Sequence, residues 1–202
     1  DVNKAIDDGA TPLFIAAHQG HEAVLQALIE AGVDVNKAID DGATPLFIAA
    51  QKGHEAIVRA LIKAVADVNK TTDNSLTPLY MAAQQGHVTV VRALIEASAD
   101  VDKAINGGAT PLYVAVQEGH DVVVRALIEA GADVNKAMDN GVTPLYFAAG
   151  FGHEAVVREL IAAGVDVNKA RDIGATTVTP LFIAAHGGHA AIVQILRGAG
   201  AV

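Results

Sequence analysis

Histidine is the residue whose spacing in this sequence first suggests chemistry. A Gly-His pair occurs six times, at Gly20-His21, Gly53-His54, Gly86-His87, Gly119-His120, Gly152-His153 and Gly188-His189. Imidazole binds zinc, but a zinc site needs three or four ligands around one ion, and stacked units place equivalent residues about 10 Å apart. The pairs His18 with His21 and His186 with His189 supply only two ligands each. We therefore expect no metal and no other cofactor, and interpret the six histidines as hydrogen-bonding residues at helix starts.

Carboxylates and hydroxyls do not form a recognisable catalytic group either. The candidate carboxylates lie at predicted turns, where Asp serves local hydrogen bonding, as at Asp7, Asp8, Asp40 and Asp41. No Ser lies beside a periodic His with a third residue to orient it. The chain has no Cys, which excludes disulfides, thiolate zinc sites and cysteine nucleophiles. We therefore predict that the protein is not an enzyme.

The elements that carry these residues repeat along the chain. Thr-Pro-Leu begins at Thr11, Thr44, Thr77, Thr110, Thr143 and Thr179. The first five starts are 33 residues apart and the last interval is 36. A fixed period of this size indicates stacked units of supersecondary structure. We expect one domain, 1–202, of six repeats with approximate bounds 1–33, 34–66, 67–99, 100–132, 133–165 and 166–202.

The second repeat shows how each one is expected to fold. Thr44 is an N-cap and Pro45 takes the first helical position, where its missing N–H is no loss, so a helix begins there. It runs to about Lys52 and ends at Gly53. The apolar residues that follow recur at the spacing of one buried helix face: Ile57, Val58, Leu61 and Ile62. Each repeat is therefore a turn followed by two antiparallel helices.

This arrangement resembles the ankyrin repeat. The family pattern, Gly-x-Thr-Pro-Leu-His-x-Ala-Ala followed by Gly-His, Leu-Leu and Gly-Ala-Asp-Val-Asn, is matched across essentially the whole chain. The resemblance implies an all-α fold with short β-hairpin loops, a solenoid of stacked helix-turn-helix units whose hairpins and first helices line a concave face. It also implies a non-catalytic scaffold that binds a protein partner on that face. Two alternatives stay open: a structural spacer within a longer array, and an engineered scaffold with no natural partner.

Two positions depart from the family pattern. The His after Thr-Pro-Leu is replaced by a ring in every repeat: Phe14, Phe47, Tyr80, Tyr113, Tyr146 and Phe182. We expect this column to pack in the core, with a ligand-binding stripe as the alternative. The Asp at the hairpin tip is replaced by Ile6, Ile39, Thr72, Ile105, Met138 and Arg171. The apolar tips are either shielded by neighbouring hairpins or form an exposed ridge.

Composition and charge restrict the partners. The net charge is -9, whereas nucleic-acid binding relies on Lys and Arg that displace counterions from phosphates. We expect no nucleic acid and a protein partner, for which a basic segment would suit the charge. No run approaches the roughly 18 apolar residues of a membrane span, and the first residues do not resemble a signal peptide. With no Cys, a reducing compartment is compatible with the sequence, and a cytoplasmic location is the default expectation.

A partner-binding surface is predicted around Phe151. This ring stands at the end of a first helix, in a column that otherwise holds Gln19, Lys52, Gln85, Glu118 and Gly187. Three extra residues in the sixth repeat lie nearby, and insertions in repeats go to loops on one face, often the binding face. Because hot spots favour aromatics ringed by polar groups, the predicted surface comprises Phe151, Tyr146, Gln117, Glu118, Thr176, Thr177 and Val178. The alternative is that the inserted loop folds over Phe151 and buries it.

Other substitutions predict local strain and association. Val65 and Ser98 replace the glycine that ends the second helix, and Ser75 replaces a turn glycine, so the third repeat is expected to open most easily. Arg197 replaces an Ile of the other repeats and resembles a C-terminal cap, whereas the N-terminal face shows no change toward polarity. We expect a monomer that can associate end to end through that N-terminal face.

The resemblance also implies a modification. In this family, an Asn in a Leu-x5-Asp-Val-Asn setting can be the substrate of an asparaginyl hydroxylase. The matching residues are Asn36, Asn69, Asn135 and Asn168. Asp102 breaks the pattern in the fourth repeat. The alternative is that these asparagines only form hydrogen bonds within the loops.

Overall fold

A Thr-Pro step starts the first helix of each repeat. The computed structural model describes residues 9–173 and 176–202, and all of their side chains except those of 172, 173 and 176. In all six repeats the Thr hydroxyl accepts a hydrogen bond from the backbone N–H three residues later, for example at 3.1 Å from Phe47 N to Thr44 Oγ1. Gly53 then takes a left-handed conformation, with φ of 75°, and ends the helix. The predicted helix starts are confirmed.

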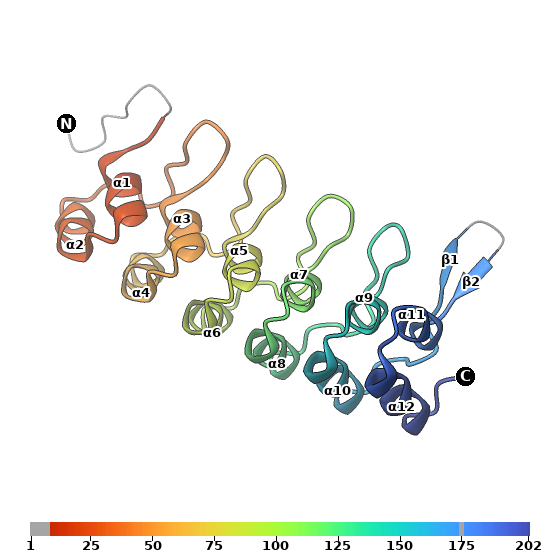
Figure 1. Cartoon of the computed structure of the whole chain (residues 1–202). Coiled ribbons are helices and arrows are strands. Elements are labelled where there is room, and N and C mark those ends of the chain that lie inside the picture. The colour runs from red at the N-terminus through yellow and green to blue at the C-terminus, as the bar shows by residue number, and fades with distance from the viewer. Residues whose placement is uncertain (1–8, 174–175) are drawn as a thin grey trace. The chain divides into compact units, whose positions relative to one another are not determined.

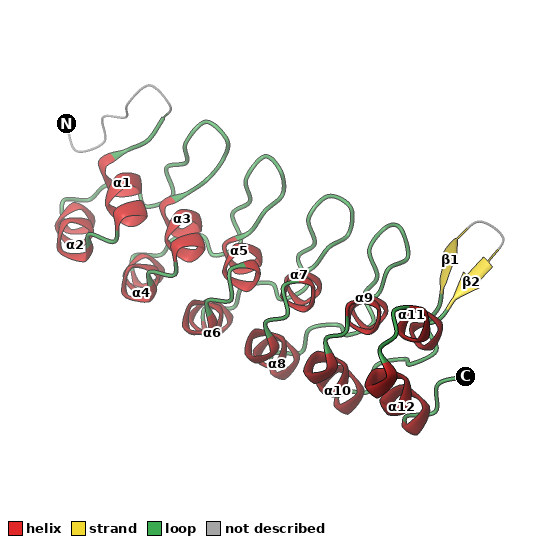
Figure 2. Ribbon diagram, viewed as in Figure 1, coloured by secondary structure: helices red, strands yellow, loops and turns green. Residues whose placement is uncertain are grey.

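The described residues form twelve helices and one pair of short strands, drawn red and yellow in Figure 2. They group into two compact units. The N-terminal unit, 1–103, contains α1 (Pro12–Gln19), α2 (Glu22–Glu30), α3 (Pro45–Lys52), α4 (Glu55–Lys63), α5 (Pro78–Gln84) and α6 (Val88–Glu96). The C-terminal unit, 104–202, contains α7 (Pro111–Gln117), α8 (Asp121–Glu129), α9 (Pro144–Phe151), α10 (Glu154–Ala162), β1 (Arg171–Ile173), β2 (Thr176–Val178), α11 (Pro180–His186) and α12 (Ala190–Gly198). The predicted all-α class with short hairpin loops is confirmed.

Within each unit the helices pack in two rows (Figure 1). The first helices contact one another in sequence order, as do the second helices, and the loops project from the row of first helices. Fully buried leucines fill the layer between the rows: Leu13, Leu25, Leu46, Leu61, Leu79, Leu94, Leu112, Leu127, Leu145 and Leu160. Burial of these side chains drives the stacking, because each helix is apolar on the side that meets its neighbours.

The Gly-His pair joins successive repeats. His87 Nε2 lies 3.1 Å from the carbonyl oxygen of Gln51 in the preceding repeat, and His54 and His189 make the equivalent contact at 3.3 and 3.0 Å. None of these three rings caps its own helix. These three histidines are thus hydrogen-bonding residues at helix starts, as predicted, but each ring bonds to a carbonyl of the preceding first helix and not to its own helix.

Strand pairing occurs only in the sixth loop among the described residues. There β1 and β2 pair antiparallel, with Arg171 opposite Val178. The second loop instead closes with isolated backbone bonds, such as Ile39 N–H to Ala43 O at 2.9 Å. The three extra residues of the sixth repeat lengthen its loop enough for a ladder three residues long. A hairpin with regular strands is thus a property of this loop, which lies next to α11.

The aromatic column is mostly core. Phe47, Tyr80, Tyr113 and Tyr146 are buried, as predicted, and Phe14 is half-buried. Phe182 is 57% exposed, so the core prediction is wrong there. In the described structure α11 packs against α9 and α12, and neither helix covers that ring.

The exposure of the loop-tip residues lies between the two predicted alternatives, a shielded row and an exposed ridge. Ile39, Ile105 and Met138 are half-buried, and Thr72 is buried. Ile6 lies outside the described residues. These tips therefore form neither a fully shielded row nor an open apolar ridge.

Among the described residues, three other than glycine adopt left-handed backbone, as the sequence predicts. The φ angles are 63° at Val65, 64° at Ser75 and 65° at Ser98. A β-branched residue is an outlier in this region, where its Cβ meets the following carbonyl. Val65 is also 82% exposed, so its side chain contributes little packing in return.

Changing Val65 to glycine is expected to raise the free energy of unfolding by about 1 kcal/mol, because relief of strain exceeds the added entropy of the unfolded chain. Urea denaturation measures the change. The matched control is Val24→Gly, an exposed valine inside α2, which should lower the free energy of unfolding by about 1 kcal/mol. A fall in stability with Val65→Gly would show that the valine is not strained.

Candidate functional site

Phe151 lies at the end of α9 and is 66% exposed. Its ring stacks on that of Phe147, one turn earlier, with centroids 4.2 Å apart and planes 13° apart. Residues four apart share a helix face, so the Thr143 cap that starts α9 sets the direction of both rings. The interpretation that the inserted loop buries Phe151 is wrong. The loop pairs with itself as β1 and β2 and leaves the ring exposed.

A pocket of about 400 Å³ lies beside Phe151 in the C-terminal unit. It is lined by Tyr113 of α7, by Tyr146, Phe147, Gly150 and Phe151 of α9, by Ile183 of α11, and by Val142 and Arg171 from the loops. The Tyr113 ring meets Phe147 edge-on at 5.7 Å. This volume lies within the range of about 300–1,000 Å³ typical of ligand sites, and a mainly apolar wall with few polar groups is also typical.

Gly150 accounts for the room in this pocket. The equivalent position in the other five repeats holds His18, Gln51, Gln84, Gln117 and His186. A Cβ at Gly150 would lie 3.1 Å from Cγ1 of Ile183 on the neighbouring helix. Because α9 carries no side chain at this place, Ile183 of α11 approaches Gly150 closely, and both residues line the pocket.

Arg171 supplies the positive charge of the pocket. Its Nε–H donates a hydrogen bond to the carbonyl oxygen of Asn140 at 3.1 Å, and its guanidinium carbon lies 6.0 Å from the centroid of the Tyr146 ring. Burial raises the pKa of the Tyr113 hydroxyl, and the nearby charge of Arg171 acts in the opposite direction. Tyr113 is therefore neutral near pH 7 and can donate a hydrogen bond.

The N-terminal unit has a hollow at the equivalent place, with a different lining. Its volume is about 260 Å³, and it lies among Phe14, Ile39, Asp41, Ala43, Phe47, Ile48, Gln51, Thr72, Asn74, Leu76 and Met81. In the alignment of repeats, Asp41 corresponds to Asn140, Gln51 to Gly150 and Thr72 to Arg171. The hollow of the N-terminal unit is thus smaller and carries a carboxylate, whereas the pocket of the C-terminal unit carries a guanidinium.

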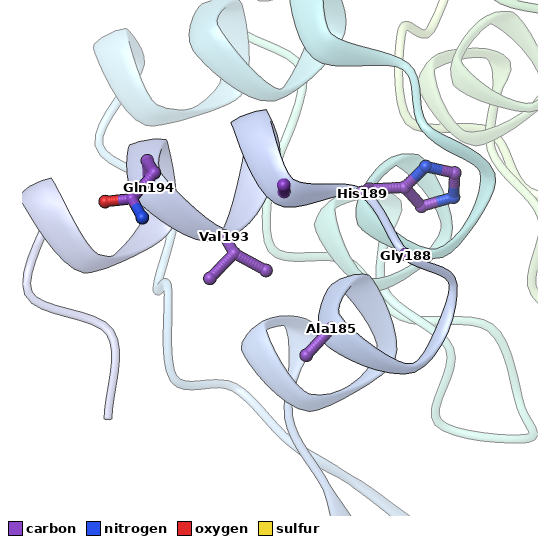
Figure 3. A pocket seen from close by; sticks show the side chains of 6 residues that line it. Ala185, Gly188, His189, Val193 and Gln194 are labelled. Carbon is purple, nitrogen blue, oxygen red and sulfur yellow. The ribbon is translucent and has the colours of Figure 1, made fainter.

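A third hollow, also of about 260 Å³, lies between α11 and α12 (Figure 3). Small side chains and backbone make up much of its wall, at Ala185, Gly188 and Ala190, with Val193 beside them. The ring of His189 points away from the hollow (Figure 3), toward its partner, the carbonyl of Gly150. No charged side chain is among the described residues of this wall.

The structure brings together two of the residues predicted to form the binding surface. Tyr146 and Phe151 both line the pocket. Gln117 and Glu118 are exposed at the end of α7, where they bond to each other at 3.2 Å, but they do not line it. Thr177 is exposed in β2. The predicted site therefore separates into an aromatic pocket and polar residues elsewhere on the C-terminal unit.

Two more residues were predicted to belong to the binding surface: Val178, which is buried, and Thr176. Val178 is 6% exposed, which makes it a core position and not a surface contact, because it takes the place that Val142 has one repeat earlier. The side chain of Thr176 lies outside the described residues.

The sequence-based site missed Phe147, Gly150 and Arg171. Phe147 replaces a non-aromatic apolar residue of the other repeats, such as Ile48. Gly150 and Arg171 are also unlike their column neighbours. Comparing every column of the repeat, and not only the column of Phe151, would have identified all three.

The four asparagines of the predicted modification sites link successive loops. Asn36 Oδ1 accepts a hydrogen bond from Asp67 N at 2.8 Å, and Asn69, Asn135 and Asn168 make the equivalent bond at 2.8, 2.9 and 3.0 Å. These contacts explain the recurrence of Asn by loop packing. Hydroxylation at these positions stays a prediction.

Within the described parts of the chain, 9–173 and 176–202, no three His, Cys, Asp or Glu residues lie close enough together to hold a metal ion. None of the helices in those parts is both long and apolar enough to span a membrane.

Comparison with known families identifies the repeat. The family model described as ankyrin repeats (three copies) matches at residues 1–72, 64–138 and 135–201. No curated protein matches the chain significantly. Repeats of this family generally serve as protein–protein interaction modules and are typically not catalytic. The matched segments together span almost the entire sequence and agree with the capped helix pairs of the structure, so the chain belongs to the ankyrin-repeat family.

Proposed function

We propose that this protein is a non-catalytic scaffold that binds a protein partner on the first-helix and loop surface of its C-terminal unit, with Phe151 as the anchor. The observation that carries the proposal is a ring that is 66% exposed and stacked at the mouth of an aromatic pocket. Leaving such a ring in water forgoes the stabilisation that burial would bring, so it is an informative exception on a folded surface.

The surroundings of Phe151 suit a binding hot spot. Energetic anchors of interfaces are mostly large aromatic or Arg side chains beside a pocket, with polar residues around them that exclude water. Tyr146 and Arg171 lie at the pocket, and Gln117, Glu118 and Thr177 supply exposed polar groups on the same unit. The net charge of -9 favours approach of a partner that has a basic segment elsewhere on its surface.

Removal of the ring tests the proposal. Phe151→Ala is expected to weaken partner binding by about 2 kcal/mol, roughly 30-fold in Kd, because it deletes the anchor. The matched control is Phe182→Ala, which removes another exposed ring of the same unit, one that stacks on His186 and lies outside the pocket.

The measurement compares wild type, Phe151→Ala and Phe182→Ala as immobilised baits in a quantitative pulldown, followed by Kd determination with each purified partner. Partners lost with Phe151→Ala and retained with Phe182→Ala support the proposal. Partners retained equally by both variants would place the contact surface elsewhere.

A further inference from the structure

The pocket beside Phe151 has a chemical character that a general binding scaffold does not require. Its described lining includes one cation, Arg171, and no carboxylate. The corresponding hollow in the N-terminal unit has Asp41 in its wall and Thr72 in the place of the arginine. Two equivalent hollows in one repeat protein thus differ in the sign of their charge.

The shape of the pocket accommodates one aromatic side chain together with a polar neighbour. A closed cavity of about 150 Å³ is enough to hold a benzene ring in a protein core, and the pocket offers about 400 Å³. Four rings line it, and aromatic pairs gain from edge-on and offset stacking: they are those of Tyr113, Tyr146, Phe147 and Phe151. Gly150 also lines the pocket and contributes no side chain to it.

The position of Arg171 determines which chemical group can stand next to a bound aromatic side chain. Its Nε–H is bonded to Asn140 O, which holds the guanidinium above the Tyr146 ring at the wall of the pocket. A guanidinium is a planar fork of five N–H donors, and a carboxylate is the group that matches this geometry in two parallel hydrogen bonds.

We propose that the pocket binds an acidic peptide segment of the partner in which a phenylalanine stands directly beside a glutamate or aspartate. The phenyl ring enters between Phe151 and Ile183, and the carboxylate pairs with Arg171. This proposal rests on the scaffold function proposed above and specifies the segment that the scaffold recognises.

The net charge of the chain does not oppose this assignment. Charges further apart than about 8–10 Å are largely screened at physiological salt. The charge of -9 therefore acts on the approach of the whole partner, whereas a carboxylate inside the pocket interacts mainly with Arg171.

Three blocked dipeptides test the assignment by NMR titration of the intact chain: N-acetyl-Phe-Glu-amide, N-acetyl-Phe-Gln-amide and N-acetyl-Phe-Lys-amide. We expect the Glu peptide to bind about tenfold more tightly than the Gln peptide, since a charge-assisted bond replaces a neutral one. The Lys peptide should bind more weakly still. Shifts should occur at Ile183, Gly150 and Arg171, and the hollow that contains Asp41 should show no preference for Glu.

Two variants test whether Arg171 causes the preference for the Glu peptide and whether the peptides bind in the pocket. Arg171→Met should equalise the Glu and Gln peptides while both still bind. Gly150→Gln should abolish binding of all three by filling the pocket. Because the new Cβ would also lie 3.1 Å from Cγ1 of Ile183, a lower melting temperature is expected, and circular dichroism must show that the variant is folded at the temperature of the titration.

Equal affinities in the wild type, a Glu preference that survives Arg171→Met, or no binding at millimolar peptide would each overturn the assignment. These outcomes are distinct from failure of the scaffold proposal. If partner capture depends on Phe151 but no Glu preference exists, the scaffold stands and the acidic segment is wrong. If the Glu preference exists but no partner depends on Phe151, the pocket chemistry stands and the anchor role is wrong.

Discussion

Replacing Gly53 with alanine is expected to lower the free energy of unfolding by about 3 kcal/mol. Gly53 has φ of 75°, where an L side chain costs about 1–2 kcal/mol. The new Cβ would also lie 2.8 Å from the ring of His87 in the next repeat. That ring must move, and its bond to the Gln51 carbonyl, now 3.1 Å long, would be lost or weakened, which costs about another 1 kcal/mol or more.

Gly32→Ala separates the two causes of this loss. Gly32 has nearly the same backbone angle, φ of 77°, but a Cβ there would have no neighbour within 4 Å. Only the backbone cost applies, so we expect a loss of about 1 kcal/mol. Urea denaturation of both variants measures the difference. Equal losses would mean that the contact between Gly53 and His87 does not stabilise the stacking of repeats.

The second large effect is expected inside α9. Leu145 is fully buried, and removal of a buried leucine side chain typically lowers the free energy of unfolding by about 2–5 kcal/mol through lost burial and the cavity left behind. We expect about 3 kcal/mol for Leu145→Ala. Thermal and urea denaturation of the purified variant measure it.

Phe151→Ala on the same helix is the matched comparison for stability. Because that ring is mostly exposed and stacks on Phe147 of the same helix, its removal should change stability by less than about 1 kcal/mol. Leu145→Ala should therefore unfold the protein at lower denaturant and Phe151→Ala should not. A loss for Phe151→Ala as large as that for Leu145→Ala would show that the ring contributes chiefly to folding.

Features that depend on local chemistry were predictable from the sequence. The start of α3 follows from the Thr44 hydroxyl and the fixed φ of Pro45, both of which act within one helical turn. The left-handed backbone at Val65 followed from its place in a glycine column. The repeat period then dictated the order of the helices, since each repeat can bury its apolar face only against its neighbours.

Features that depend on the neighbouring repeat required the tertiary structure. The partner of His87 is a carbonyl 36 residues earlier, and no pattern within one repeat indicates it. Phe182 and Tyr146 occupy the same column, yet only Tyr146 is buried, because burial depends on what packs against the ring. The binding site shows the same division. The identity of Phe151 as an unusual residue is visible in the sequence. Its stacking on Phe147 is local to α9. Its exposure and its pocket depend on side chains from α7, α11 and β1, which only packing brings together.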